Sequence, residues 1–285
     1  MSSLLLTKIV AVTVLLVGSI SAKDVAPDEQ NGWKRVDKNI PLPGVWGRTI
    51  SEGLTHDDVH WYLNSKKVLY KATKNNLEKV AENKHAIPSE LADQKYGHIG
   101  DIDCFDGVLY GGIEISKSEP GVIASWNASD LTLLQFQVTG QSGMPWVAAD
   151  GAAGLLYSTH WSDTGRINVF DMATFAQRDD LTIFPLSSAA DDQFPPEIQG
   201  AAFYDKDPGF LYLAVNGAES VYKVNVATGE LHFVLSDEQY KTHEAEMEVR
   251  VYLYLHQFLG LLLGLLLGWS APVSVHVYVC VSHRH

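Results

Sequence analysis

Cysteine is almost missing from this chain of 285 residues. The sequence holds only Cys104 and Cys280, which lie 176 positions apart. They can form one disulfide bridge at most, so the fold cannot be a small disulfide-stapled scaffold and must depend on an apolar core. We expect Cys104 to be a buried free thiol, because Cys280 belongs to a C-terminal segment of unusual composition.

Positive charge is scarce as well. The 21 lysines and arginines face 34 aspartates and glutamates, which gives a formal net charge of -13. Such a chain offers little counter-charge for phosphates, so we expect no nucleic acid among its partners. Its 46% of hydrophobic residues is too high for a disordered protein, and its length allows one large domain or two small ones.

The sequence motifs of several enzyme classes are also missing. There is no Gly-x-Ser-x-Gly elbow, no P-loop, no Rossmann fingerprint and no His-Glu-x-x-His pair. Serine hydrolases of the α/β type, nucleotide-dependent chemistry and zinc proteases are therefore disfavoured. Whether the chain is an enzyme stays open at this point.

The N-terminus has the order of a secretory signal peptide over residues 1–22. One cation, Lys8, precedes the apolar run Ile9–Val17, and a stretch of small residues ends at Ala22. The alternative is a buried N-terminal helix. Secretion predicts an extracellular protein in an oxidising compartment, where the Asn-Ala-Ser sequon at Asn127 would be a glycosylation site.

The C-terminal segment 249–285 has a different composition from the rest of the chain. It contains no acidic residue, and the apolar run 258–281 is long enough to cross a bilayer, which would make a single-pass type I membrane protein. A second interpretation is a translated intron, since a GT-repeat tract encodes Val-Tyr-Val-Cys-Val. An ordinary core helix is a third. An uninterrupted reading frame in the transcript at the Glu248 codon would exclude the intron.

Between these ends, one short pattern repeats. A turn with glycine leads into a Leu-Tyr strand at Gly107–Tyr110, Gly154–Tyr157 and Gly209–Tyr212, and the Leu-Tyr steps are 47 and 55 residues apart. One predicted strand precedes each copy and two follow it. The predicted strands of the three units are 99–105, 107–110, 121–126 and 131–138; 145–149, 154–157, 165–170 and 178–184; 199–204, 209–212, 219–224 and 230–235. A more degenerate copy occupies 59–63, 67–71 and 77–80.

Four short strands per unit of about 45 residues predict an all-β fold, a β-propeller with about four recognisable blades over residues 49–248. A β-sandwich is the alternative. Residues 23–48 are interpreted as a lead-in. The one predicted helical turn is 88–94, capped by Ser89.

A family resemblance rests on residues 97–103, 106–110, 112–114 and 145–148. They resemble secreted six-bladed propellers of the strictosidine-synthase and arylesterase (calcium-dependent phosphotriesterase) type, and are similar to YVTN and quinoprotein-like propellers. The resemblance covers about 49–246. It implies six blades, so we expect an incomplete ring and an inactive chain at this length. It also implies calcium at the channel floor, held by Glu, Asn and Asp, but no matching pair of asparagines occurs here.

The innermost strands of a propeller begin near its axis, so polar residues at their starts converge. Asp101 and Asp103 are two residues apart on one predicted inner strand and point to the same side. Together with Glu114 they are the candidate calcium ligands, since hard oxygen donors suit calcium. Alternatively, the two aspartates cap turns and tie blades together through backbone N–H groups. The further channel candidates are His98, Trp146, Asp150, Gln199 and Glu246.

Two functions remain as hypotheses. The first is a secreted propeller scaffold that binds a protein or small-molecule ligand through its rim loops. The second is a calcium-dependent hydrolase of the lactonase or arylesterase kind, with its site in the propeller channel. A membrane enters only if 258–281 is a genuine span.

Overall fold

The computed structural model describes residues 33–35, 52–161, 165–187, 197–216, 220–236, 252–254 and 275–278. The predicted signal peptide, Glu246 and nearly all of the apolar tail lie outside these residues. The described part is almost entirely β-structure, with one short helix, α2 (Ser89–Ala92), and one 3-10 turn, η3 (Asp179–Leu181). None of its helices has the length and apolar character that crossing a membrane requires.

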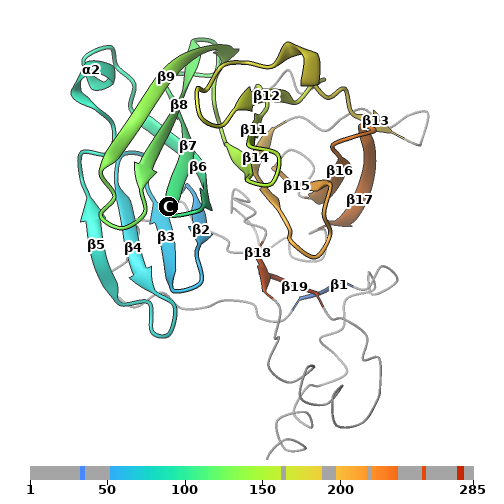
Figure 1. The fold of residues 1–285 in the computed structure, drawn as a ribbon, viewed down its shortest axis with the longest axis horizontal. Helices are drawn as coiled ribbons and strands as arrows, with labels where there is room; N and C mark the ends of the chain where they lie inside the picture. Colours follow the sequence, from blue (N-terminus) through green and yellow to red (C-terminus); the bar gives the residue numbers. More distant parts are fainter. Residues whose placement is uncertain are drawn as a thin grey trace, which may run out of the picture.

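Four antiparallel sheets follow one another along the chain around an arc, and we call them blades 1 to 4 (Figure 1). Blade 1 contains β2 (Leu54–His56), β3 (His60–Asn64), β4 (Leu69–Thr73) and β5 (Lys79–Asn83). Blade 2 contains β6 (His98–Phe105), β7 (Val108–Glu114), β8 (Pro120–Asn127) and β9 (Leu133–Ser142). Blade 3 contains β10 (Ala148–Asp150), β11 (Leu155–Ser158) and β12 (Asn168–Asp171), and the bridges Ile167–Ile183 and Phe170–Gln177 add its outer segment. Blade 4 contains β14 (Ile198–Phe203), β15 (Phe210–Val215), β16 (Ser220–Asn225) and β17 (Glu230–Ser236).

Two smaller features accompany the blades. The short strand β13 (Leu186–Ser187) pairs in parallel with the outer strand β17 of blade 4. A separate three-stranded sheet joins β1 (Trp33–Arg35), β19 (Val275–Tyr278) and β18 (Tyr252–Tyr254). The strand β19 falls within the predicted membrane span, whose other residues lie outside the described part.

Consecutive blades pack face to face through apolar clusters. The cluster between blades 1 and 2 contains Tyr62, Leu69, Ile99, Leu109, Ile113 and Trp126. The cluster between blades 2 and 3 contains Tyr110, Ile123, Met144, Leu156, Phe170 and Phe175. The cluster between blades 3 and 4 contains Trp146, Tyr157, Val169, Leu211, Leu213 and Val224. Sheets stacked in this way around an arc form a β-propeller with an incomplete ring, as the repeats predict.

The repeated glycines form the turns that the pattern predicts. Gly107, Gly154 and Gly209 have φ angles of 76°, 69° and 84°, a region in which a side chain is disfavoured. Each turn leads into the second strand of its blade, and the tyrosine of each copy is buried there. The strands of blades 2 and 4 consequently begin within two residues of the predicted positions, but β7, β9 and β15 end three or four residues beyond the predicted ends.

The strand prediction for blade 1 was wrong by one strand. The predicted segments 59–63, 67–71 and 77–80 are its second, third and fourth strands, and its first strand, β2, was not predicted. The equivalence is visible in a shared hydrogen bond. The hydroxyl of Tyr62 donates to Asp57 at 2.6 Å, and that of Tyr212 donates to Asp207 at 2.6 Å in blade 4. Tyr62 is therefore the repeat tyrosine of blade 1.

The predicted cap of the helical turn was wrong. Helix α2 begins at Ser89, but the N-cap position is Pro88, and no side chain caps the turn. The helix is held instead by Leu91, which is buried in the cluster between blades 1 and 2. Ser89 lies inside the helix, where its hydroxyl faces Glu90.

The four innermost strands, β2, β6, β10 and β14, approach each other closely where they begin. A Cβ on Gly100 would lie 2.1 Å from the carbonyl oxygen of Pro145, and one on Gly200 would lie 2.3 Å from Oδ2 of Asp101. A Cβ on Gly53 would lie 2.9 Å from Oδ1 of Asp101. Glycine at these positions lets the inner strands of blades 1, 2 and 4 converge on one carboxylate.

Candidate functional site

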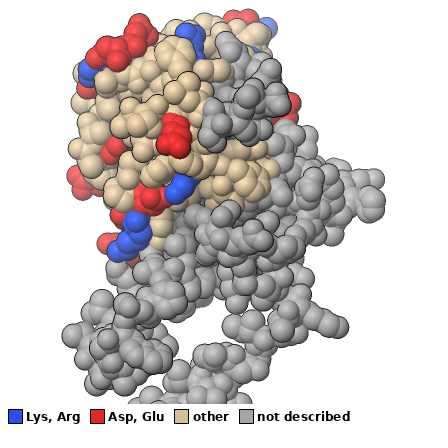
Figure 2. All heavy atoms as spheres, turned by 90° about the vertical axis from the view of Figure 1, so that its right-hand side faces the viewer, with Lys and Arg blue, Asp and Glu red and all other residues tan. Residues whose placement is uncertain are grey.

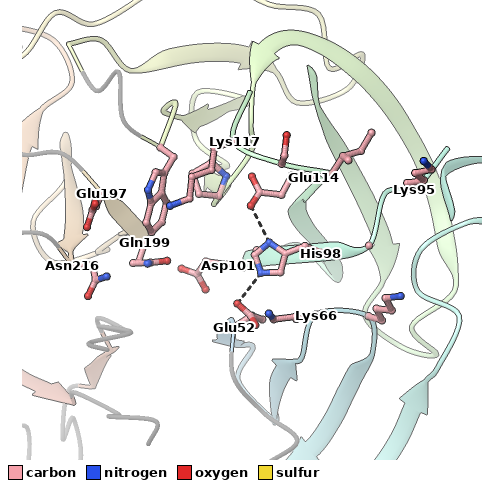
Figure 3. A pocket seen from close by; sticks show the side chains of 17 residues that line it. Glu52, Lys66, Lys95, His98, Asp101, Glu114, Lys117, Glu197, Gln199 and Asn216 are labelled. Atoms are coloured by element: carbon pink, nitrogen blue, oxygen red, sulfur yellow. Dashed lines mark hydrogen bonds and ion pairs between the residues drawn. The ribbon is translucent and has the colours of Figure 1, made fainter. Parts of the chain in front are cut away.

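A cavity of about 710 Å³ lies on the inner side of the arc, at the level where the innermost strands begin. We call it the mouth pocket. All four blades contribute to it, and most of its lining is polar (Figure 3). Its ionisable and amide side chains are Glu52, Lys66, Lys67, Lys95, His98, Asp101, Glu114, Lys117, Glu197, Gln199 and Asn216.

A histidine between two glutamates occupies the centre of the mouth pocket. His98 Nδ1 is 2.9 Å from Oε1 of Glu114, and His98 Nε2 is 2.9 Å from Oε2 of Glu52 (Figure 3). Burial lowers the pKa of His98, but the hydrogen bonds to Glu114 and Glu52 outweigh burial and raise the pKa to about 9. His98 is therefore a cation at neutral pH.

Strand pairing brings together two members of the triad Glu52, His98 and Glu114. His98 is the first residue of β6 and lies directly opposite Glu114, the last residue of β7. The second oxygen of Glu114 accepts a hydrogen bond of 3.0 Å from the backbone N–H of Met144. Burial would raise the pKa of Glu114, but the hydrogen bonds from His98 and Met144 lower it below its usual value. Glu52 comes from the segment just before β2, so the triad also joins blade 1 to blade 2.

Asp101 lies at the centre of the converging inner strands, as the sequence predicts. Its N–H donates to the carbonyl of Pro145 at 2.9 Å, and it forms a parallel bridge with Trp146. Its carboxylate lies against Gly53 of blade 1 and Gly200 of blade 4. The residue therefore contacts all three other blades from the floor of the mouth pocket.

Asp103 does not line the mouth pocket. It accepts a hydrogen bond of 2.9 Å from the N–H of Ala149 in blade 3 and one of 3.2 Å from the hydroxyl of Thr55 in blade 1. Burial raises the pKa of Asp103 to about 6, although these hydrogen bonds oppose the shift. The alternative interpretation, an aspartate that ties neighbouring blades together, is the one that the structure supports at this position.

The three predicted calcium ligands do not fit a calcium site as they lie. The carboxylate of Glu114 is bound to the cation His98, and the oxygens of Asp103 are held by hydrogen-bond donors. Within the described residues, no group of three or more His, Cys, Asp or Glu side chains is arranged to hold a metal ion. Calcium binding by Asp101, Asp103 and Glu114 stays a prediction.

The remaining predicted channel residues separate into distinct places. Gln199 lines the mouth pocket. Trp146 lies in the core between blades 3 and 4, fully buried, where its indole N–H donates to Thr159 Oγ1 at 3.2 Å. Asp150 lies at the far end of β10 and accepts the N–H of Ala153. Glu246 lies outside the described residues.

Two other sequence predictions have a structural position. The predicted acceptor Asn127 ends β8, and its Oδ1 accepts the N–H of Ser129 in the turn to β9. Its glycosylation stays a prediction. Cys104 is a free thiol, and burial raises its pKa to about 12, which keeps it protonated and unreactive.

Sequence reasoning missed most of the pocket's basic residues. Lys66 and Lys67 form the turn between β3 and β4, Lys95 follows α2, and Lys117 lies in the loop between β7 and β8. The Nζ atom of Lys117 lies 3.6 Å from the ring centre of Trp161, which follows β11. These residues come from loops of unlike sequence, so no repeat points to them. Glu52 would have been found had β2 been recognised, because it precedes that strand.

Comparisons with known proteins add little about chemistry. No family profile matches the chain, and no curated protein matches it. Among solved structures, it is similar to glutaminyl cyclase of Myxococcus xanthus, with 14% identity, a TM-score of 0.48, and 66% of this chain and 69% of that chain covered. It is also similar to hydrazine synthase of Kuenenia stuttgartiensis, with 11% identity, a TM-score of 0.44, and 76% of this chain and 54% of that chain covered. At this level of similarity, neither structure says what this chain binds.

Proposed function

We propose that this propeller is a scaffold that binds a small hydrophilic molecule in the mouth pocket. The observation that supports the proposal is the convergence of polar side chains from the starts of the inner strands and from the rim loops on one cavity. Ligand sites are typically concave and carry a few polar groups that fix the ligand's orientation. The volume of about 710 Å³ suits a small molecule.

Several of these polar groups are available to a ligand. Within the described residues, the side chains of Glu197, Gln199 and Asn216 make no hydrogen bond to the protein. Some lysines outside the pocket do form ion pairs: Lys223, for example, bonds Asp207 at 2.7 Å. Lys66 makes no such ion pair within the same part of the chain. Unpaired donors and acceptors of this kind can bind a solute without first breaking internal bonds.

The geometry favours binding over acid–base catalysis. Both ring nitrogens of His98 are engaged by carboxylates, so this histidine offers no vacant nitrogen to take a proton from a substrate. The alternative function is a calcium-dependent lactonase or arylesterase, and the described residues add no observation in its favour.

We further propose that the protein binds its ligand outside the cell. This part rests on residues 1–22, which have the pattern of a signal peptide and lie outside the described residues. The rim lysines Lys66, Lys67 and Lys95 are exposed, so an extracellular solute could reach the pocket.

A thermal-shift screen of hydrophilic metabolites on the purified chain tests the proposal, and a stabilising compound would also show that the expectation of an inactive chain at this length is wrong. A ligand at 100 times its Kd stabilises the folded state by about 2.7 kcal/mol, which raises Tm by several degrees. We expect at least one compound to do so with the wild type and to lose the effect with Glu197→Gln and with Lys117→Ala.

The matched control is Lys206→Ala, an exposed lysine in the turn between β14 and β15, at the opposite end of β14 from the pocket. This variant should keep the full shift. The proposal fails if no compound stabilises the wild type, or if the compounds that do so act equally on both pocket variants.

A further inference from the structure

Charge is sorted across the mouth pocket. Lys66 and Lys95 lie on one side, and Glu197 and Asn216 lie on the opposite side (Figure 3). Lys67 lies on the same side, because its Cε is close to Gly97, which is two residues from Lys95: a Cβ on Gly97 would lie 3.5 Å from Lys67 Cε. One wall of the pocket therefore carries three lysines. The other carries Glu197 and amides, next to Trp161, on whose ring the Nζ atom of Lys117 lies at 3.6 Å.

The backbone fixes both walls. The carbonyl of Lys66 accepts the N–H of Ile99 at 2.7 Å, which ties the β3–β4 turn to the start of β6. On the other side, the N–H of Glu197 donates to Trp161 at 3.0 Å, and its carbonyl accepts the N–H of Asn216 at 2.9 Å. The two walls are parts of the folded blades, so the distance between them is set before a ligand arrives.

Two of the wall residues have an unfavourable backbone conformation. Lys95 has φ of 73° and Glu197 has φ of 62°, the left-handed region that disfavours residues with a side chain by about 1 kcal/mol. Glycine would relieve this strain at either place. The chain has instead a cation at one position and an anion at the other, facing the same cavity.

The centre of the pocket does not neutralise either wall. His98 lies between the walls, and its charge is already shared by Glu52 and Glu114 at 2.9 Å each. Within the described residues, Lys66, Lys67 and Lys95 form no ion pair, and Glu197 forms none either. Opposite charges are thus held apart in one cavity, with His98, Glu52 and Glu114 between them and no ion pair joining the two walls within the described residues (Figure 3).

We propose that the ligand is a small zwitterion, with an anionic group on the lysine wall and a protonated amine on the Glu197 wall. This inference rests on the proposed function and specifies its ligand class. Gln199 and Asn216 supply amide oxygens beside Glu197 that can accept the remaining N–H bonds of the amine. A ligand of either single charge would leave one wall without a partner.

Calorimetric titration with defined probes tests the ligand class. The probes are ω-amino carboxylates from 3-aminopropanoate to 8-aminooctanoate, with hexanoate and hexylamine as the singly charged controls. We expect one amino carboxylate to bind at least about ten-fold more tightly than either control, since one additional charge-assisted contact contributes about 1.4 kcal/mol or more.

Variants that remove charge show which end of the ligand binds to which wall. The triple variant Lys66→Gln, Lys67→Gln, Lys95→Gln should weaken the amino carboxylate and hexanoate about ten-fold and leave hexylamine unchanged. Glu197→Gln should weaken the amino carboxylate and hexylamine and leave hexanoate unchanged. Lys206→Gln is the matched control and should change none of them. Unchanged melting temperatures without ligand show that the variants fold.

The inference is overturned if a singly charged control binds as tightly as every amino carboxylate, or if both variants weaken all probes alike. It is also overturned if no probe binds while the metabolite screen yields a binder, and in that case the proposed function stands. If neither the probes nor the screen yields a binder, the proposed function itself has failed.

Discussion

Replacing His98 by glutamine should change how the stability of the propeller depends on pH. In the folded protein the pKa of His98 is raised from 6.5 to about 9, because hydrogen bonds to Glu114 and Glu52 outweigh burial. A raised pKa of the folded state stabilises that state fully below pH 6.5, and the contribution is lost as the pH rises through 9. On the acid side, the lowered pKa of Glu114 means that its contribution is lost as the pH falls through its folded value.

The size of the effect follows from the shift. From 6.5 to about 9 the difference corresponds to about 3 kcal/mol. The side chain of His98 is 30% exposed, so solvent screens the triad and we expect about 2 kcal/mol. The free energy of unfolding of the wild type, relative to His98→Gln, should therefore fall by about 2 kcal/mol between pH 6 and pH 10.

Urea unfolding at several pH values, followed by tryptophan fluorescence, measures this difference. His85→Gln is the matched control, because His85 is exposed and lies outside the mouth pocket, and it should differ from the wild type by a constant amount. A wild-type advantage over His98→Gln that stays constant from pH 6 to pH 10 would refute the reasoning. A pKa of His98 near 6.5 in an NMR titration would refute it as well.

Two further substitutions test the inner strands. Between pH 4 and pH 7, Asp103→Asn should gain about 2 kcal/mol of stability relative to the wild type. The pKa of the buried wild-type carboxyl is raised from 3.8 to about 6, so its ionisation destabilises the folded state. A pH-independent difference in urea unfolding would contradict this. Gly100→Ala should cost at least about 2 kcal/mol, because its Cβ would lie 2.1 Å from the carbonyl oxygen of Pro145. Gly140→Ala is the control, since its Cβ would meet nothing closer than 3.8 Å, and equal melting temperatures for the two alanine variants would count against the packing described here.

The blade pattern was predictable because it depends on local chemistry. Glycine at 107, 154 and 209 is required by the positive φ of the turns, and the alternating apolar residues that follow are required by packing between sheets. The first strand of blade 1 was missed because β2 has only three residues and is followed directly by the polar turn at Asp57 and Asp58. A strand so short carries almost no periodicity.

The site was predictable only in part, for a physical reason. His98, Asp101, Glu114 and Gln199 line the mouth pocket as expected, because inner strands converge where they begin. The lysine wall comes from loops, whose sequences follow no repeat, so its position depends on tertiary structure. Trp146 was assigned to the channel, yet its large apolar ring is buried between blades 3 and 4.

The different surroundings of Asp101 and Asp103 could not be predicted from the sequence either. Their spacing suggested one shared ligand site, but neighbouring blades supply different surroundings. Asp101 lies against Gly53 and Gly200 and lines the mouth pocket, where its Oδ1 accepts the N–H of Ile102. Asp103 lies outside the pocket and accepts hydrogen bonds from Thr55 and Ala149. Spacing within one strand cannot reveal what the adjacent strands bring to each position.

The most direct test of the central claim is 19F NMR on protein labelled with 5-fluorotryptophan, titrated with the tightest-binding compound. Trp161 lines the mouth pocket, whereas Trp126 and Trp146 are fully buried in the cores between blades. We predict that the resonance missing in Trp161→Phe shifts on titration, while those of Trp126 and Trp146 stay in place. A ligand that leaves the Trp161 resonance unmoved, or that shifts all three together, would contradict a binding site in the mouth pocket.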